Sequence, residues 1–305
     1  MPRELRQRAG RPRRPGEEGD VPFGPVPFMR WAKEVYEADG IHFLAGSGIY
    51  GLLEEADLDL DRIAPRVWLK NSFGLPALRK AIAARHGVRP EQVLTAEGAS
   101  GANFLILAAW IRPGDPVLLE EPYYDSFGTL LAGLQARIVR VPVDGDAGHE
   151  AILEAVRSRR GARPRAVIVT NPHNPTGRPL ADSLLRSLAE RCAETGALLL
   201  VDEAYRDFLF EETPGTAYRE GMPVVSTASL TKGFGLGVLR IGWAIGPEEL
   251  IDRAIRIHDN FGVVHPALTE AIGAAILSDA GRLAGWRERV RARVAANREH
   301  LARFL

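Results

Sequence analysis

The chain of 305 residues lacks several features that identify whole classes of protein. Its one cysteine, Cys192, cannot form an intramolecular disulfide, so a reducing cytoplasm is the expected compartment. Basic and acidic residues balance at 39 each, which gives no general attraction to nucleic acid or to a membrane surface. No apolar run approaches the roughly 20 residues of a membrane-spanning helix. We therefore expect neither nucleic acid nor membrane as a partner.

The common nucleotide-binding loops are also missing. The sequence contains no G-x-x-x-x-G-K-[ST] motif, and residues 233–242 (GFGLGVLRIG) do not fit G-x-G-x-x-G. The same segment precedes a predicted strand, whereas both motifs lead into a helix. Lys232, which stands directly before it, is therefore either an ordinary loop lysine or a nucleophile.

Changes of composition along the chain predict four parts. Residues 1–20 are rich in Arg, Pro and Gly and predict a disordered basic tail. Residues 21–65 predict an N-terminal arm or part of a small domain, and residues 66–280 a large domain. Residues 281–305 predict one long helix with an apolar stripe and no capping glycine. We expect this helix to connect to a C-terminal small domain that the sequence does not include.

The large domain alternates short apolar runs with helical segments. The runs are 116–120, 136–143, 165–170, 197–203, 224–229 and 240–245, and the helical segments are 75–87, 102–111, 149–160 and 181–195. Short apolar runs between helices predict an α/β fold of three layers, with a mostly parallel sheet covered on both faces. Such sheets bind ligands beyond the carboxyl ends of their strands.

Four segments at predicted strand ends have both an ordinary and a functional explanation. Ser100 can cap a helix, or the backbone around it can hold an anion at the helix start. Tyr123 and Tyr124 can belong to the core, or one of them can stack on a flat ring. Residues 170–177 (TNPHNPTG) can be a simple turn. Asp202 can cap a helix or bind a metal, or it can be a buried carboxylate with a cationic partner.

Taken together, these segments suit a flat, phosphorylated, nitrogen-containing ring held as an imine. In order and spacing, EGASGAN, PYY, NPHNPTG, VDEAY and SLTKGFGLGVLRIGW resemble the fold-type I pyridoxal-phosphate enzymes, specifically the class I/II aminotransferases. The resemblance runs from about residue 40 to the end. It implies a homodimeric enzyme that uses pyridoxal 5'-phosphate and no metal, and that moves an amino group between an amino acid and a 2-oxo acid.

The resemblance also implies catalytic roles for individual residues. Lys232 would form the internal aldimine and then move the proton, which requires a depressed pKa. Asp202 would pair with the pyridinium nitrogen and keep it protonated. Asn174 and Tyr205 would hydrogen-bond the 3' oxygen of the ring, and Tyr124 would stack on its face.

Another set of residues is implied to hold the phosphate. Backbone N–H groups of Ser100, Gly101 and Ala102 would form the cradle, and Ser229 and Arg240 would complete it. The planar guanidinium of Arg240 suits a bidentate contact with phosphate.

Two departures from the family pattern concern the substrate and the partner subunit. The family usually has a tyrosine about five residues before the glycine that matches Gly74, whereas this chain has Trp68 and Leu69 there. The arginine that binds the substrate carboxylate lies in the family's C-terminal small domain, so no residue here can take that role. Tyr50 is a candidate on the substrate side, and a buried loop tyrosine is its alternative explanation.

Two other functions remain open at this point. The same motifs occur on enzymes that eliminate a C–S bond, decarboxylate or close a ring, and they do not separate these reactions from transamination. A ligand-sensing domain of a transcription regulator is the non-enzymatic alternative. The short basic tail is too small for the winged-helix module that such regulators carry, which favours an enzyme.

Overall fold

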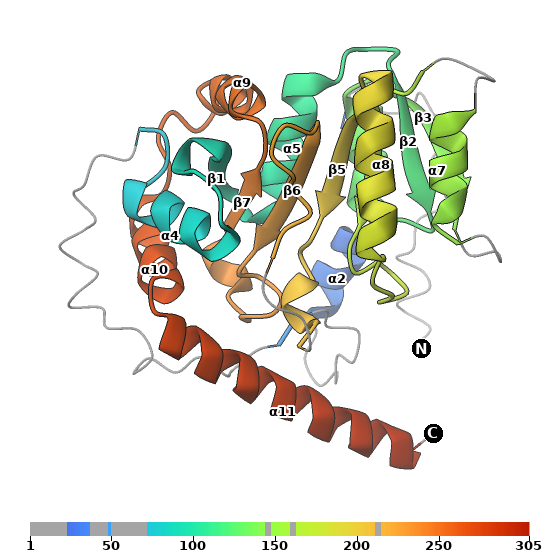
Figure 1. Ribbon diagram of the computed structural model, residues 1–305. Helices are drawn as coiled ribbons and strands as arrows, with labels where there is room; N and C mark the ends of the chain where they lie inside the picture. The colour runs from blue at the N-terminus through green and yellow to red at the C-terminus, as the bar shows by residue number, and fades with distance from the viewer. Residues whose placement is uncertain are drawn as a thin grey trace.

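The computed structural model describes residues 23–36, 48–49, 72–143, 148–158, 163–210 and 215–304 (Figure 1). The strands are β1 (Val93–Glu97), β2 (Pro116–Glu121), β3 (Arg137–Pro142), β4 (Ala166–Thr170), β5 (Leu198–Asp202), β6 (Val224–Ser229) and β7 (Ile241–Ile245). The helices are α2 (Pro27–Tyr36), α4 (Pro76–His86), α5 (Gly98–Trp110), α6 (Asp125–Gly133), α7 (Glu150–Arg157), α8 (Asp182–Thr195), α9 (Glu248–His258), α10 (Ala267–Leu277) and α11 (Ala280–Phe304). Short 3-10 turns are η3 (Pro90–Gln92), η4 (Arg206–Phe208) and η5 (Gly237–Leu239).

The seven strands form one sheet in the order β1-β7-β6-β5-β4-β2-β3. Strands β6, β5, β4, β2 and β3 are parallel, and β7 and β1 add two antiparallel pairings at one edge. The predicted mostly parallel sheet is confirmed, and each of the six predicted strands is present to within one residue at either end. The prediction omitted α6, α9 and α10.

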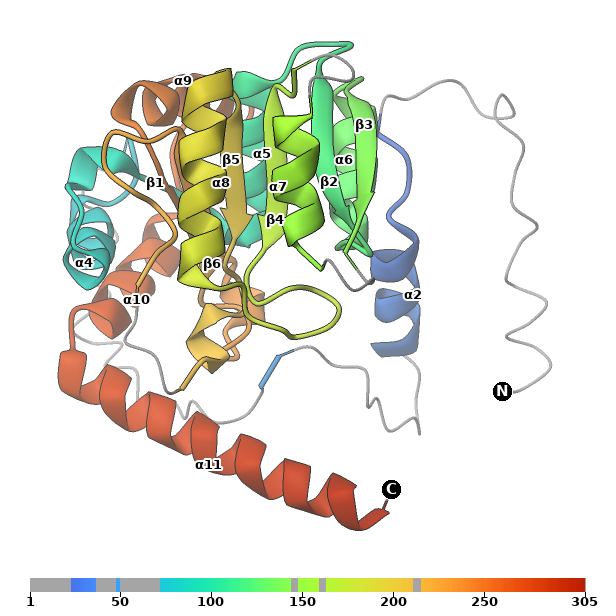
Figure 2. The ribbon, with the colours of Figure 1, turned by 45° about the vertical axis from the view of Figure 1, so that its right-hand side comes forward.

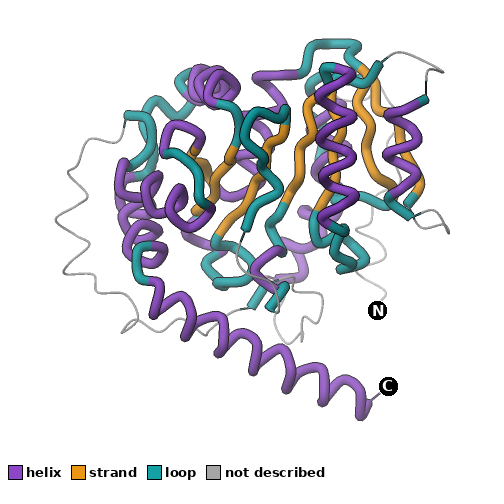
Figure 3. The backbone as a smooth tube through the Cα atoms, in the orientation of Figure 1, coloured by secondary structure: helices purple, strands orange, loops and turns teal. Residues whose placement is uncertain are grey.

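Helices cover both faces of the sheet, which makes the predicted three layers (Figures 1 and 3). The side chains of β5 alternate: Leu198 and Leu200 pack with α5, α6 and α9, and Leu199 and Val201 pack with α7 and α8. Full burial of a leucine or valine side chain stabilises the fold by about 1.5–3 kcal/mol. The uninterrupted apolar run of β5 is therefore explained by a core on each side of the sheet.

The carboxyl ends of the parallel strands meet at one edge of the molecule, and α2 lies beneath this edge (Figures 1 and 2). The backbone N–H of Phe28 in α2 donates to Asp125 Oδ2 at the start of α6 (3.1 Å).

The predicted long C-terminal helix is present as α11, which extends away from the body of the molecule (Figure 2). Its first half is anchored by Trp286, which stacks on Phe234 with ring centroids 6.0 Å apart. Near its end, Leu301 and Phe304 are exposed. None of the helices in the described ranges has an apolar stretch long enough to cross a bilayer.

Candidate active site

Three neighbouring strands carry polar side chains in a row near the carboxyl edge of the sheet. The register pairs Thr170 of β4 with Asp202 of β5, and Asp202 with Thr227 of β6. The turn after β4 carries Asn174, and the turn after β6 carries Lys232. Parallel strand order therefore brings together motifs that are far apart in the sequence.

Asp202 is the buried acid of this edge, with 6% of its surface exposed. Its Oδ2 accepts a hydrogen bond from Asn103 Nδ2 (2.7 Å), and its Oδ1 accepts one from the backbone N–H of Ala204 (2.9 Å). The amide oxygen of Asn103 accepts from the hydroxyl of Thr227 (2.7 Å), which directs the NH2 group toward Asp202. Asp202 is thus held in one orientation from two sides.

The negative charge of Asp202 is energetically unfavourable because the carboxylate is buried. Burial raises the pKa of Asp202, and the negative charge of Glu120 raises it as well. The hydrogen bonds from Ala204 and Asn103 and the positive charge of Lys232 act in the opposite direction. A buried carboxylate of this kind is stabilised by a cationic or protonated partner, such as the pyridinium N–H expected from the sequence.

Sequence reasoning gave no role to Asn103. It lies on α5, is 3% exposed, and is the one strongly polar side chain in the apolar segment ANFLILAAW. A buried amide requires hydrogen-bond partners, so a single asparagine in such a segment is a signal that could have indicated this role.

Lys232 lies above the ring of Tyr205, with its Nζ 5.6 Å from the ring centroid. Burial lowers the pKa of Lys232, and the positive charge of Arg240 lowers it further, while Asp202 opposes both effects. The backbone carbonyl of Lys232 accepts a hydrogen bond from the N–H of Ile49 (3.3 Å), which brings the N-terminal segment to this turn. The side chain has the environment that the predicted nucleophile needs.

Arg240 reaches across to the end of β1. Its Nη2 donates to the carbonyl oxygen of Glu97 (3.1 Å), directly before the start of α5. Gly98 has φ +76°, and a Cβ there would lie 2.4 Å from Arg240 Nη2. A Cβ on Gly242 would in turn lie 2.2 Å from the carbonyl carbon of Gly98. These two glycines let the guanidinium approach the start of α5 closely.

The helix that supplies the predicted cradle begins earlier than the sequence indicated. We predicted a helix from residue 102, whereas α5 begins at Gly98, because the glycine allows the chain to turn directly from β1 into the helix. The first turn of a helix has backbone N–H groups without intrahelical partners. Ser100 and Gly101 lie in this turn, while Ala102 lies just beyond it and is fully buried.

The two predicted aromatic candidates lie in different surroundings. Tyr124 lines a cavity of about 400 Å³ together with Ser100 and Asn103. Tyr123 instead packs against Arg140, whose guanidinium carbon is 5.7 Å from the centroid of its ring. Of the two, Tyr124 shares a cavity with residues near Asp202.

Ser229 and Asn174, two further predicted cofactor residues, both lie in the described part of the chain. Ser229 is buried at the end of β6, and its Oγ accepts from the backbone N–H of Thr231 (3.3 Å). The backbone N–H of Asn174 donates to Thr170 Oγ1 (2.8 Å). Tyr50, like Trp68 and Leu69, lies outside the described residues.

The donors and acceptors of this edge fit the expected cofactor. A helix start with a neighbouring guanidinium suits a phosphate, and a buried carboxylate suits a protonated ring nitrogen. Lys232, on whose pKa both Arg240 and Asp202 act and which has a lowered pKa, suits attack on a carbonyl carbon. These are the groups that a ring with a phosphate and a basic nitrogen requires.

The chain is similar in sequence to proteins of one family. Residues 68–305 match the family model described as aminotransferase class I and II. Arginine–pyruvate transaminase AruH of Pseudomonas aeruginosa is 33% identical over 190 residues, which are 58% of this chain and 47% of that protein. The probable N-succinyldiaminopimelate aminotransferase DapC of Mycobacterium tuberculosis is 38% identical over 192 residues, 58% of this chain and 48% of that protein.

A solved structure shares the fold over most of the chain. The N-succinyldiaminopimelate aminotransferase of Mycobacterium tuberculosis superposes with a TM-score of 0.74 at 28% identity, covering 92% of this chain and 76% of that one. The chain spans about half the length of the curated relatives it matches.

Proposed function

Because the chain belongs to the class I and II aminotransferase family, we propose that it binds pyridoxal 5'-phosphate through an imine with Lys232. We further propose that it moves an amino group between an amino acid and a 2-oxo acid. The observation that carries the proposal is that Asp202, at the end of β5, meets Lys232 and Arg240, which both lie in the segment between β6 and β7, at one edge of the sheet.

Asp202 and its supporting residues provide the proposed electronic control of the ring. The cofactor, when bound, supplies a ring that accepts electrons from the substrate's Cα. Asp202 would hold the proton on the ring nitrogen, because its carboxylate is buried and requires a cationic partner. Asn103 fixes the direction of that carboxylate through its bond to Asp202 Oδ2.

Lys232 is the proposed nucleophile and proton carrier. Its lowered pKa increases the fraction of neutral amine at physiological pH, and only the neutral amine can attack a carbonyl or accept a proton. Arg240 has a double role in this proposal, since its charge lowers the pKa of Lys232 and its guanidinium faces the start of α5. Ser100, Gly101, Ala102 and Ser229 would complete the phosphate site.

A homodimer in the cytoplasm is part of the proposal. Supporting it, the segments around Arg240 and the α9–α10 connection expose large apolar side chains, including Val238 (90%), Val263 (67%) and Phe261 (58%). Phe261 and Val263 are two residues apart in the α9–α10 connection, and exposed apolar side chains that lie close together are typical of a protein interface. Light scattering after size-exclusion chromatography measures the molecular mass, and a monomer at all concentrations would contradict this part.

The test begins with cofactor attachment. Purified protein is incubated with pyridoxal phosphate, reduced with borohydride, and digested for mass spectrometry. We expect the added mass on the peptide that contains Lys232, none in Lys232→Ala, and wild-type labelling in Lys80→Ala, a variant of the exposed lysine on α4. Labelling elsewhere, or none, would overturn the proposal.

The second stage measures the reaction class with a panel of amino acids. Conversion of bound pyridoxal phosphate to pyridoxamine phosphate, reversed by a 2-oxo acid, is expected for transamination. Release of ammonia and pyruvate from cysteine without an oxo-acid acceptor would instead identify an eliminating lyase. Absence of both reactions would refute the proposed activity for this chain.

A further inference from the structure

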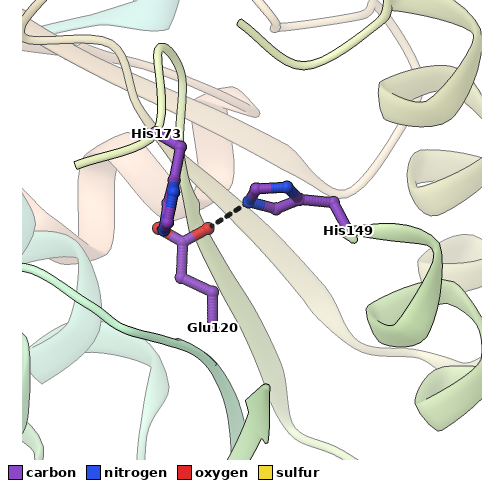
Figure 4. Close-up of side chains that lie close together, drawn as sticks. All are labelled: Glu120, His149 and His173. Carbon is purple, nitrogen blue, oxygen red and sulfur yellow. Dashed lines mark hydrogen bonds and ion pairs between the residues drawn. The ribbon is translucent and has the colours of Figure 1, made fainter. Parts of the chain in front are cut away.

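Three side chains that the proposed function does not use lie together near the same edge of the sheet (Figure 4). Glu120 stands near the end of β2 with 1% of its side chain exposed, His149 precedes α7, and His173 lies in the turn after β4. His149 Nε2 is 3.1 Å from Glu120 Oε2, and one ligand atom from each of the three residues lies within 4.8 Å of the others. Such a cluster can either bind a metal or form a hydrogen-bond network.

The surroundings of His173 favour the network. Its Nε2 is 2.9 Å from the carbonyl oxygen of Pro122, and a carbonyl only accepts, so this nitrogen carries a hydrogen. Its Nδ1 then has the lone pair, which faces the hydroxyl of Thr176 at 2.8 Å. Both ring nitrogens are therefore engaged, which leaves His173 without a lone pair for a metal in this arrangement.

Hydrogen bonds connect Glu120 to Thr170 and, through Thr170, to Asn174. Its Oε1 accepts from both the backbone N–H of Thr170 (2.8 Å) and the hydroxyl of Thr170 (2.6 Å). A hydroxyl has one hydrogen, so once it is donated to Glu120, the oxygen's lone pairs are left to accept. One of them accepts from the backbone N–H of Asn174 at 2.8 Å. Glu120 thereby determines which way the Thr170 hydroxyl faces, and the hydroxyl holds the backbone of Asn174.

We propose that Glu120 and His149 form a positioning pair that acts through Thr170 to hold Asn174 in place for the cofactor ring. His149 engages the second carboxylate oxygen, so that Oε1 stays directed at Thr170. The inference rests on the proposed function, because Asn174 is the residue expected to contact the 3' oxygen of the ring. The reaction itself involves neither Glu120 nor His149.

The hydrogen bonds that connect His149, Glu120, Thr170 and Asn174 form a relay, and matched variants can test its steps. Thr170→Val removes the hydroxyl, and Thr170→Ser keeps it. His149→Leu removes the ring nitrogen that faces Glu120, and His149→Gln keeps a donor. Glu154→Gln, an exposed acid on α7, is the control for a change that leaves the relay intact. Circular dichroism and urea unfolding verify that each variant is folded.

The measurement is the dissociation constant of pyridoxal phosphate, followed by fluorescence, together with the absorbance spectrum of the bound cofactor. Thr170→Val and His149→Leu should weaken binding about fivefold to tenfold, the size expected for one hydrogen bond. Thr170→Ser, His149→Gln and Glu154→Gln should stay close to wild type.

A double-mutant cycle separates positioning from a general structural effect. If Thr170 acts through Asn174, Thr170→Val should add almost nothing in an Asn174→Ala background. Independent, additive losses would overturn the inference, as would equal weakening by Thr170→Ser. An Asn174→Ala variant with unchanged affinity would overturn it too, since there would be nothing to position.

Two further outcomes have different meanings. A wild-type protein that does not bind pyridoxal phosphate would refute the proposed function, and the inference would fall with it. Stoichiometric Zn²⁺ binding in equilibrium dialysis that is lost in His149→Leu would refute the network alone and identify a metal site.

Discussion

Arg240 lies so close to Gly98 that an alanine there should displace the guanidinium, and an alanine at Gly87 is the matched control. Gly98 and Gly87 both have positive φ, +76° and +66°, so an alanine at either position is strained in the same way. A Cβ on Gly98 would lie 2.4 Å from Arg240 Nη2, whereas a Cβ on Gly87, at the end of α4, meets nothing within 4 Å. The difference between the two alanine variants therefore reports the displacement of Arg240.

The magnitude follows from two contributions. A left-handed backbone costs a residue with a Cβ about 1–2 kcal/mol, so Gly87→Ala should lower the free energy of unfolding by about that amount. In Gly98→Ala the guanidinium must also leave the carbonyl of Glu97, and a hydrogen bond to a charged group contributes about 1.5–3 kcal/mol. We expect a total loss of about 2.5–5 kcal/mol for Gly98→Ala in urea unfolding of the cofactor-free protein.

The same displacement should appear in cofactor binding. If Arg240 holds the phosphate, Gly98→Ala should weaken pyridoxal-phosphate binding about tenfold to a hundredfold, and Gly87→Ala should leave it unchanged. Equal losses of stability in the two variants, with equal cofactor affinity, would refute the close-approach reasoning.

Three further predictions concern the buried groups. Asn103→Ala leaves Asp202 and Thr227 each with one partner fewer, so urea unfolding should show a loss of about 2–4 kcal/mol; an unchanged midpoint would contradict the bridging role. Burial lowers the pKa of His86 from 6.5 to about 3. Between these two pH values the unfolded state binds more protons than the folded state, so the free energy of unfolding decreases as the pH is lowered. Between pH 6.5 and about 4.5, wild type should therefore lose about 2–3 kcal/mol more than His86→Leu, and parallel pH profiles would refute this. Leu200→Ala opens a cavity at a fully buried position and should cost about 2–5 kcal/mol, whereas a cost below about 1 kcal/mol would show that the core relaxes around it.

The sequence predicts the large domain well because its signals are local. The apolar runs of β4 and β5 and the helical segment of α8 are each readable from about ten neighbouring residues, and all three are present. The prediction was wrong at the start of α5, where a glycine permits the helix to begin four residues early. The omitted α9 and α10 lie between the last predicted strand and the predicted helix of residues 281–305, where no helix or strand was predicted.

The sequence predicted which residues form the candidate site better than it predicted the hydrogen bonds between them. Lys232, Asp202, Asn174 and Arg240 were identified from motifs, and their placement at one edge of the sheet agrees with parallel strand order. The roles of individual residues stay predictions until the cofactor experiments are done. Tyr50 remains a candidate outside the described residues.

By itself, the sequence determined the family, the alternation of strands and helices, and the residue types at the strand ends, because these depend on local pattern and spacing. Only the tertiary structure decided that Asn103 bridges Asp202 and Thr227, which are 99 and 124 residues away from it. Likewise, Glu120 meets Thr170 across 50 residues. The physical reason is that strand order and register select the neighbours of a buried polar group, and no local pattern records which distant group will satisfy it.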